Sequence, residues 1–144
     1  MTELSLNSQT SVSRIRTYFM RGLFALNFLS LFTDNWSQIL FPTEQMDTLT
    51  GVTISFWAAF SLLNLIGIRF PIKMVPILLI QFLYKLAWLI GIYRPAYLND
   101  SVDENIQSFF WICIAGVGLN LLIIPWKYVY QEYIKNFFKL KKAA

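Results

Sequence analysis

Residues 49–68 read LTGVTISFWAAFSLLNLIGI, an unbroken run without a charged side chain. This run can cross a bilayer as a helix, because one crossing takes about 20 mostly apolar residues. Three further apolar stretches, at residues 16–33, 74–92 and 106–124, surround it. The first is free of charge only over residues 22–32, but no small-x-small cleavage site follows it, so we interpret it as a retained helix and not as a signal peptide. The sequence predicts an all-α fold, a four-helix transmembrane bundle that makes residues 1–144 one integral membrane domain.

The charged residues between these stretches alternate in sign. Ten of the twelve Lys and Arg residues lie in the N-terminal segment, the second gap and the tail, whereas six of the eight acids lie in the first and third gaps. Segments rich in Lys and Arg remain on the cytoplasmic side of a membrane. The pattern therefore predicts four crossings with both termini in the cytoplasm.

The composition excludes several classes of protein. It is 56% hydrophobic and only 14% charged, against about 25% charged in an average soluble domain. The basic residues gather at predicted membrane boundaries, so the net charge of +4 indicates membrane lipids with anionic headgroups, and not nucleic acid, as the partner. There is no histidine, no C-x-x-C pair and no nucleotide-binding motif, and Cys113 is the single cysteine. We therefore predict no catalytic residue, no metal and no cofactor.

Each predicted crossing carries one amide side chain at a similar depth. These residues are Asn27, Asn64, Gln81 and Asn120. They either join the helices by hydrogen bonds, each worth roughly 0.6 kcal/mol, or line a cavity that holds a ligand. In both cases they should face one another as a polar layer, because an amide turned toward lipid leaves its polar groups unsatisfied.

Lys85 is the candidate functional residue. It lies about 18 Å along the third helix from Lys73, near the bilayer midplane. A lysine at that depth costs about 2.5 to 3.5 kcal/mol unless it finds water, a partner or the interface. Asp34, Asp103 and Glu104 are the acids it could approach, and tryptophan rings offer cation–π contacts. Lys85 is either a structural, snorkelling lysine or the centre of a binding site formed by Lys85, Gln81, Tyr84, Trp57, Trp88 and Trp111.

Small residues mark the faces on which helices could touch, because helix association in lipid favours close approach of the backbones. Gly51, Ser55 and Ala59 follow one another at spacings of four, and Ala115, Gly116 and Gly118 lie in the fourth stretch. They serve either packing within the bundle or a seam between two copies. Pro76 is expected in the second turn of the third helix, where it would remove a hydrogen bond and bend the chain.

The tail is too polar to be a fifth crossing. On a helix over residues 126–142, most apolar side chains fall on one side and the lysines on the other. This pattern predicts a C-terminal amphipathic helix in the inner interface, bound to anionic headgroups. The alternative is a straight extension of the fourth helix into the cytoplasm.

The second and third stretches carry a resemblance. The segments 69–79, RFPIKMVPILL, and 81–89, QFLYKLAWL, resemble an uncharacterised family of small four-helix bacterial membrane proteins, and the architecture is similar to that of DoxX-like proteins. The resemblance implies a compact bundle in a bacterial inner membrane. It carries over no catalytic residue.

These observations favour a non-enzymatic accessory or self-associating membrane protein, present as a homo-oligomer or within a larger membrane complex. One alternative is the binding or transport of a small lipid-soluble or anionic molecule at Lys85. Another is a membrane enzyme that acts on a lipid or quinone with Lys85 as its acid or base. A cavity at Lys85 would favour these alternatives, and a packed surrounding would argue against them.

Overall fold

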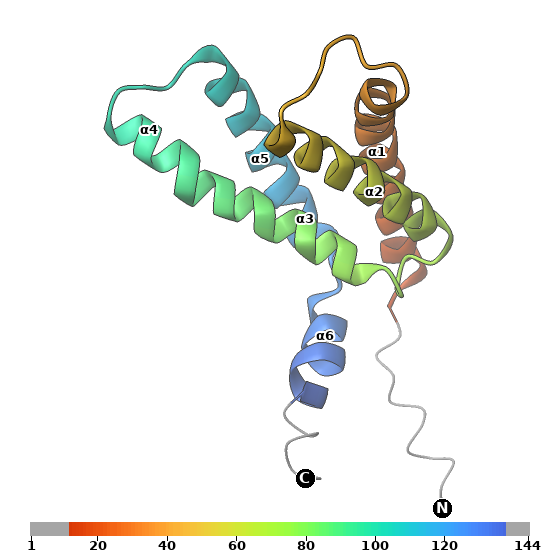
Figure 1. The fold of residues 1–144 in the computed structure, drawn as a ribbon. Helices are drawn as coiled ribbons and strands as arrows, with labels where there is room; N and C mark the ends of the chain where they lie inside the picture. Colours follow the sequence, from red (N-terminus) through yellow and green to blue (C-terminus); the bar gives the residue numbers. More distant parts are fainter. Residues whose placement is uncertain (1–11, 138–144) are drawn as a thin grey trace, which may run out of the picture.

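The computed structural model describes residues 12–137, and within them every regular element is a helix (Figure 1). The longer helices are α1 (Arg14–Leu40), α2 (Thr48–Arg69), α3 (Val75–Trp88) and α5 (Glu104–Ile123). The shorter ones are the π-helix η1 (Leu89–Tyr93), α4 (Arg94–Leu98), α6 (Trp126–Val129) and the π-helix η2 (Tyr130–Lys135). The predicted all-α class is confirmed for the described residues.

Three helical segments are long and apolar enough to cross a membrane: Thr48–Arg69, Val75–Leu98 and Glu104–Ile123. They contain most of the predicted crossings at 49–68, 74–92 and 106–124. The predicted crossing at 16–33 lies inside α1, which is not among the three. Arginines at the start of α1 and polar residues from Asp34 onward leave too short an apolar run. The four-crossing bundle therefore has support from three of its helices.

Helix α1 ends seven residues later than predicted, at Leu40 rather than at residue 33. Its last turns are held by hydrogen bonds that the local pattern does not reveal. The Trp36 indole Nε1 donates to the Ala58 carbonyl at 3.2 Å and lies 3.3 Å from the Ser61 hydroxyl, both on α2. Packing against α2 thus extends α1 through a polar segment.

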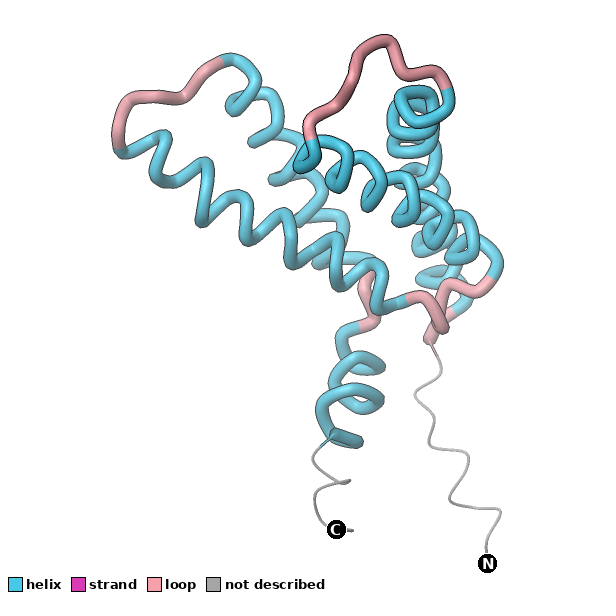
Figure 2. The backbone as a smooth tube through the Cα atoms, in the orientation of Figure 1, coloured by secondary structure: helices cyan, strands magenta, loops and turns pink. Residues whose placement is uncertain are grey.

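The helices form two antiparallel pairs (Figure 2). Helix α1 packs most extensively on α2, and α3 on α5, while smaller contacts join α2 to α3 and α1 to α5. The shared core lies near the α2–α3 turn and the end of α5, where the fully buried side chains of Met20, Phe24, Leu78 and Ile124 meet. At the opposite end, which carries the two long loops, the pairs lie further apart (Figure 1).

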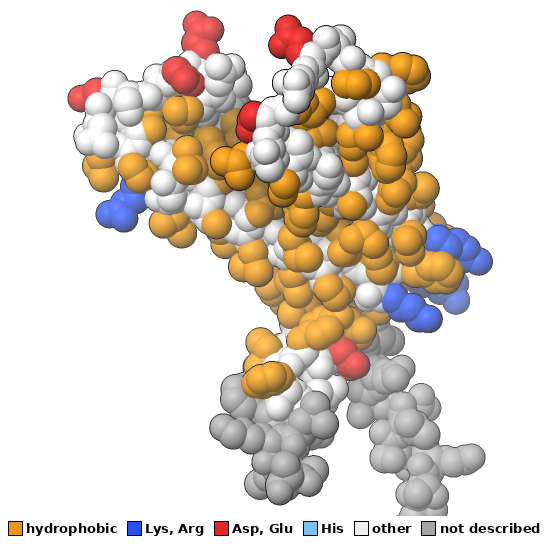
Figure 3. Space-filling model, in the orientation of Figure 1, with side chains coloured by type: hydrophobic (Ala, Val, Ile, Leu, Met, Phe, Trp, Pro, Cys, Tyr) orange, Lys and Arg blue, Asp and Glu red, His pale blue; other side chains and the backbone are white. Residues whose placement is uncertain are grey.

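The charged side chains are distributed unevenly between these two ends of the molecule. On the face drawn in Figure 3, Asp and Glu side chains gather at the end with the α1–α2 and α4–α5 loops, and most Lys and Arg side chains lie toward the other end. Apolar side chains cover much of the drawn surface between them. The exposed large apolar side chains of the chain include Leu83, Ile90, Leu121 and Leu122. This is the arrangement expected of a protein whose apolar flanks face lipid.

Two prolines shape the third helical segment. Pro76 lies at the very start of α3, where no intrahelical hydrogen bond is lost, so the predicted bend in the second turn is wrong. Pro95, further along, cannot donate to the carbonyl one turn earlier. Just before Pro95 the α-helix changes into the π-helix η1, and the Arg94 N–H donates to the Leu89 carbonyl. The π-helix lets the segment continue through Pro95 to Leu98.

The tail does not continue α5 in a straight line. The backbone leaves the helical region at Ile124 (ψ 129°) and Pro125 (ψ 77°), then α6 begins at Trp126. The indole of Trp126 donates to the Leu121 carbonyl at 2.9 Å, which fixes the break. Val129 is buried in the core, whereas Tyr130, Ile134 and Phe137 are exposed. Residues 138–142 of the predicted interfacial helix lie outside the described residues.

Candidate functional site

The Lys85 side chain lies inside the α3–α5 pair and is only 5% exposed. Its aliphatic chain and amine lie on Gly116 of α5: a Cβ added to Gly116 would fall 2.8 Å from Lys85 Cδ and 2.8 Å from Nζ. Only a glycine leaves room for the lysine at this point. Lys85 therefore points into the bundle, and the open backbone of Gly116 is what accommodates it.

Aromatic rings surround the amine on one side. Lys85 Nζ lies 5.0 Å from the centroid of the Tyr84 ring, and the Trp57 ring of α2 meets Tyr84 edge-on at 4.9 Å. A cation over an aromatic face gains about 0.5 to 2 kcal/mol, more where water is excluded. Within residues 12–137 no carboxylate forms an ion pair with Lys85, so the suggested approach of Asp34, Asp103 or Glu104 does not occur there.

The other two tryptophans of the predicted site, Trp88 and Trp111, do not contact Lys85 or Tyr84 in this group. The Trp88 ring packs against Phe109 of α5 at 4.7 Å, one turn beyond Lys85. Trp111 is 62% exposed, and its nearest described ring is Phe110. The structure thus brings together Lys85, Tyr84 and Trp57, and it leaves Trp111 on the outer face of α5.

The four amides are all buried, but only two of them bond to each other. Asn27 Nδ2 donates to Gln81 Oε1 at 2.7 Å, and Gln81 Nε2 donates to Asn27 Oδ1 at 2.5 Å. This reciprocal pair joins α1 to α3. Asn64 instead donates to Phe60 O at 2.8 Å, and Asn120 donates to Gly116 O at 2.7 Å, each within its own helix. The Oδ1 atoms of Asn64 and Asn120 are buried and have no hydrogen-bond partner among the described residues.

The antiparallel order of the helices explains these positions. Lys85 lies level with Gly116, so Gln81, one turn before Lys85, lies level with Asn120, one turn after Gly116. In the other pair, Gly67 of α2 lies on Phe24 of α1, which sets Asn64 near the level of Asn27. All four amides therefore occupy one depth, one helical turn from Lys85.

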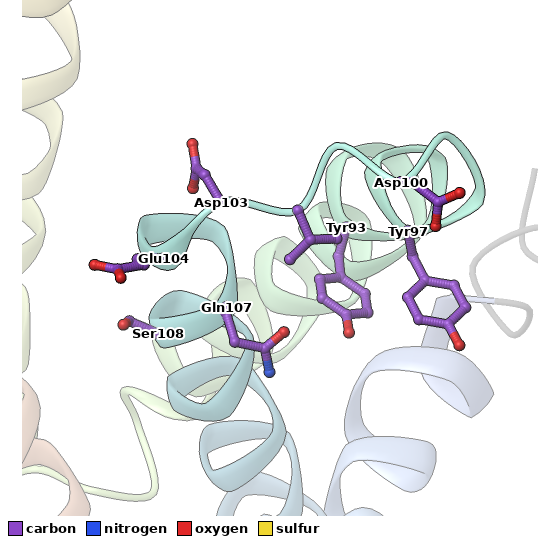
Figure 4. Close-up of a pocket in the computed structure, with 8 residues that line it drawn as sticks. Tyr93, Tyr97, Asp100, Asp103, Glu104, Gln107 and Ser108 are labelled. Atoms are coloured by element: carbon purple, nitrogen blue, oxygen red, sulfur yellow. The ribbon is translucent and has the colours of Figure 1, made fainter.

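A separate cavity of about 670 Å³ lies at the loop end, between α4 and α5 (Figure 4). Tyr93, Tyr97 and Gln107 point to one side of it. The carboxylates of Asp103 and Glu104 point away from those side chains, and Asp103 caps α5 by accepting from the Ile106 N–H at 2.7 Å. Diverging carboxylates cannot share a cation, and no group of three metal-ligating side chains exists in the part of the chain that the structure describes.

Two more cavities, of about 520 and 460 Å³, lie at the α1–α2 loop, and an apolar one of about 360 Å³ lies beside Trp36. The α1–α2 loop is ordered by Asp47, which caps α2 and accepts from the N–H groups of Leu49 and Thr50. The hydrogen bond from the Thr50 hydroxyl, with those from the backbone, lowers the pKa of the Asp47 carboxyl. Lys85 lines none of these four cavities.

Comparison with known proteins gave no match: no protein-family model, no curated protein and no solved structure matches this chain. The resemblance to DoxX-like proteins therefore assigns no role to any residue of the site. The chemistry that remains is that of the side chains themselves: an amine, amides and aromatic rings.

Sequence reasoning missed Gly116 as the residue that makes room for Lys85. Counting along an antiparallel pair with the predicted bounds 74–92 and 106–124 places Lys85 opposite Cys113, three residues from Gly116. The direction of the Lys85 side chain decides between Gly116 and its small neighbours, and that direction depends on the rotation of α3.

Proposed function

We propose that this protein is a non-enzymatic, self-associating integral membrane protein whose copies meet through α2. One observation carries the proposal. The small residues Gly51, Ser55 and Ala59 do not pack within the chain: Ser55 and Ala59 are exposed, and a Cβ added to Gly51 would meet nothing within 4 Å. Of the two roles open to this row, packing within one bundle and a seam between copies, the second is therefore favoured.

Two further observations support association. Only 11% of the apolar span of α5 and 33% of that of α2 are buried inside the chain. In lipid, apolar exposure alone does not drive association, but small residues let a second backbone approach closely. The cavities also favour this function over the two alternatives, because Lys85 lines none of the four and lies packed on Gly116.

Replacing the small residues of this row on α2 with larger ones should separate the copies. We expect Gly51→Leu and Ala59→Leu to weaken self-association in lipid vesicles at least tenfold each, because a leucine holds the backbones apart; tenfold corresponds to about 1.4 kcal/mol. The measurement is energy transfer between donor- and acceptor-labelled chains at several protein-to-lipid ratios.

The matched control is Gly22→Leu on α1, where an added Cβ also meets nothing within 4 Å. This variant should associate like the original chain. Energy transfer that shows only monomers in the original chain, or equal association in all variants, would contradict the proposal.

The proposal includes the topology: four crossings counting α1, both termini in the cytoplasm, and α6 with η2 in the inner interface of a bacterial inner membrane. The charge distribution along the helices supports it. The exposed side chains of Tyr130, Ile134 and Phe137 would enter the headgroup region, with Lys127 and Lys135 toward anionic lipid.

Cysteine labelling tests this topology. Cysteines placed at Glu44 and Asp103, both exposed at the loop end, should react in intact cells with a maleimide that cannot cross the membrane. A cysteine placed at Lys73, exposed in the α2–α3 turn, should react only after the membrane is opened. The native Cys113 is fully buried and gives little background. Protection of either loop site, or labelling of Lys73→Cys from outside, would refute the four-crossing arrangement.

A further inference from the structure

The α2–α3 turn, at the end opposite the two long loops (Figure 1), places two cationic side chains on one aromatic ring. Arg69 Cζ lies 5.4 Å from the centroid of the Phe70 ring, and Lys73 Nζ lies 5.8 Å from the same centroid. Phe70 is 47% exposed, and Arg69 and Lys73 are exposed as well. Their contact with a single ring keeps the two positive charges close together at the surface.

These charges are not neutralised within the described part of the chain. Residues 48–99 contain no acidic side chain. Among residues 12–137, neither Arg69 nor Lys73 forms an ion pair. Helix α3 begins two residues after Lys73, with no acid in its first turn and no side chain that caps it, so the positive end of its dipole adds to the two cations. The turn is therefore suited to an anion with several acceptor oxygens, such as a phosphate group.

An exposed apolar row on α2 leads to these cations. Leu62 and Ile66 are exposed and precede Phe70 at spacings of four, which places the three side chains on one face. The Phe70 N–H still donates to the Ile66 carbonyl, so the helical turn continues as far as the ring. The row extends about 12 Å along the helix, and it faces acyl chains in a bilayer. A phosphate ion would contact the cations alone, whereas a phospholipid would contact both the cations and the row.

We propose that the α2–α3 turn binds an anionic phospholipid, whose phosphate oxygens accept from Arg69 and Lys73 while an acyl chain lies along Leu62 and Ile66. A zwitterionic headgroup would bring its own cation toward two others and lose part of this attraction. The site is separate from the C-terminal helix in the inner interface. It also goes beyond the proposed self-association, because all of its residues belong to one copy.

Native mass spectrometry of the full chain in detergent micelles tests the site. The chain is titrated with phosphatidylglycerol or with phosphatidylcholine of the same acyl chains, and the Kd of the first bound lipid is measured. Phosphatidylglycerol should bind more tightly. Replacing both cations, Arg69→Gln with Lys73→Gln, should raise its Kd at least about tenfold, because each cation contributes attraction to an anionic headgroup. Equal binding of the two lipids, or an unchanged Kd in this variant, would overturn the proposal.

Two variants separate this site from general charge and from the fold. Lys127→Gln with Lys135→Gln removes the same charge from the tail and should leave the Kd of the first phosphatidylglycerol nearly unchanged. Arg69→Lys with Lys73→Arg keeps both cations in the turn and should bind like the original chain. An equal loss of affinity in the tail variant and in the turn variant would contradict a site at the turn.

Two further measurements identify the ligand and isolate the site from self-association. Glycerophosphoglycerol, the same headgroup without acyl chains, should not displace the bound lipid at equal concentration. Displacement would show a site for free phosphate compounds and contradict the role of the apolar row. Gly51→Leu, which should separate the copies, should retain the lipid, so a failure of self-association is distinguishable from a failure of this site. Loss of the lipid in Gly51→Leu would contradict a site within one copy.

Discussion

Gly67→Ala should destabilise the protein by about 1 to 3 kcal/mol relative to Gly22→Ala. A Cβ on Gly67 would fall 2.5 Å from Phe24 Cε1 and 2.6 Å from Phe24 Cγ, closer than side-chain carbons approach in proteins. The Phe24 ring is fully buried in the core, where α1 and α2 pack together. The added methyl group must therefore separate the two helices or force the ring from its rotamer.

Gly22→Ala isolates this effect from the intrinsic gain of replacing a glycine in a helix, which is at most about 1 kcal/mol. Gly22 lies in α1, and a Cβ there meets nothing within 4 Å. The measurement is reversible unfolding in bicelles or mixed micelles for both variants.

The double variant Gly67→Ala with Phe24→Leu should regain part of the loss, because a leucine no longer fills the space of the ring. Equal stability of the Gly67→Ala and Gly22→Ala proteins would show that α1 and α2 do not pack closely at this point.

The helical class and the approximate limits of three crossings could be predicted from the sequence, because the length of an uncharged run is a local property. The far end of α1 could not. It depends on the bond from Trp36 to α2, which joins residues more than twenty positions apart. The polar tail of α1 has no apolar pattern that would predict a helix, so long-range packing decides its structure.

The candidate site, too, could be predicted from the sequence only in part. Depth along a helix follows from residue counting, which predicted a similar depth for the four amides and a position near the bilayer midplane for Lys85. Partner choice depends on the rotation of each helix about its axis, which the apolar pattern leaves undetermined when a helix is apolar on all sides. For this reason the pairing of Asn27 with Gln81, the contact of Lys85 with Gly116 and the exposure of Trp111 required the structure.

Gln81→Met alone should cost about 1 to 3 kcal/mol of stability, because it leaves both buried hydrogen-bonding groups of Asn27 without a partner. Asn27→Leu alone should cost a similar amount, because it leaves the Gln81 amide unsatisfied. Combining them removes donor and acceptor together, so the double variant should be more stable than the sum of the single losses implies.

The coupling energy in this cycle should approach about 1.7 kcal/mol, the upper end of values found for hydrogen bonds between membrane helices, because two bonds are lost at once. Ser30→Ala provides the control cycle with Gln81→Met: Ser30 lies on the same helix as Asn27, but it is exposed and bonds to Leu26 O of its own helix. That cycle should show no coupling. Additive losses for Asn27→Leu and Gln81→Met would mean that the two amides do not bond in the membrane, and that the link between the α1–α2 pair and the α3–α5 pair lies in apolar packing alone.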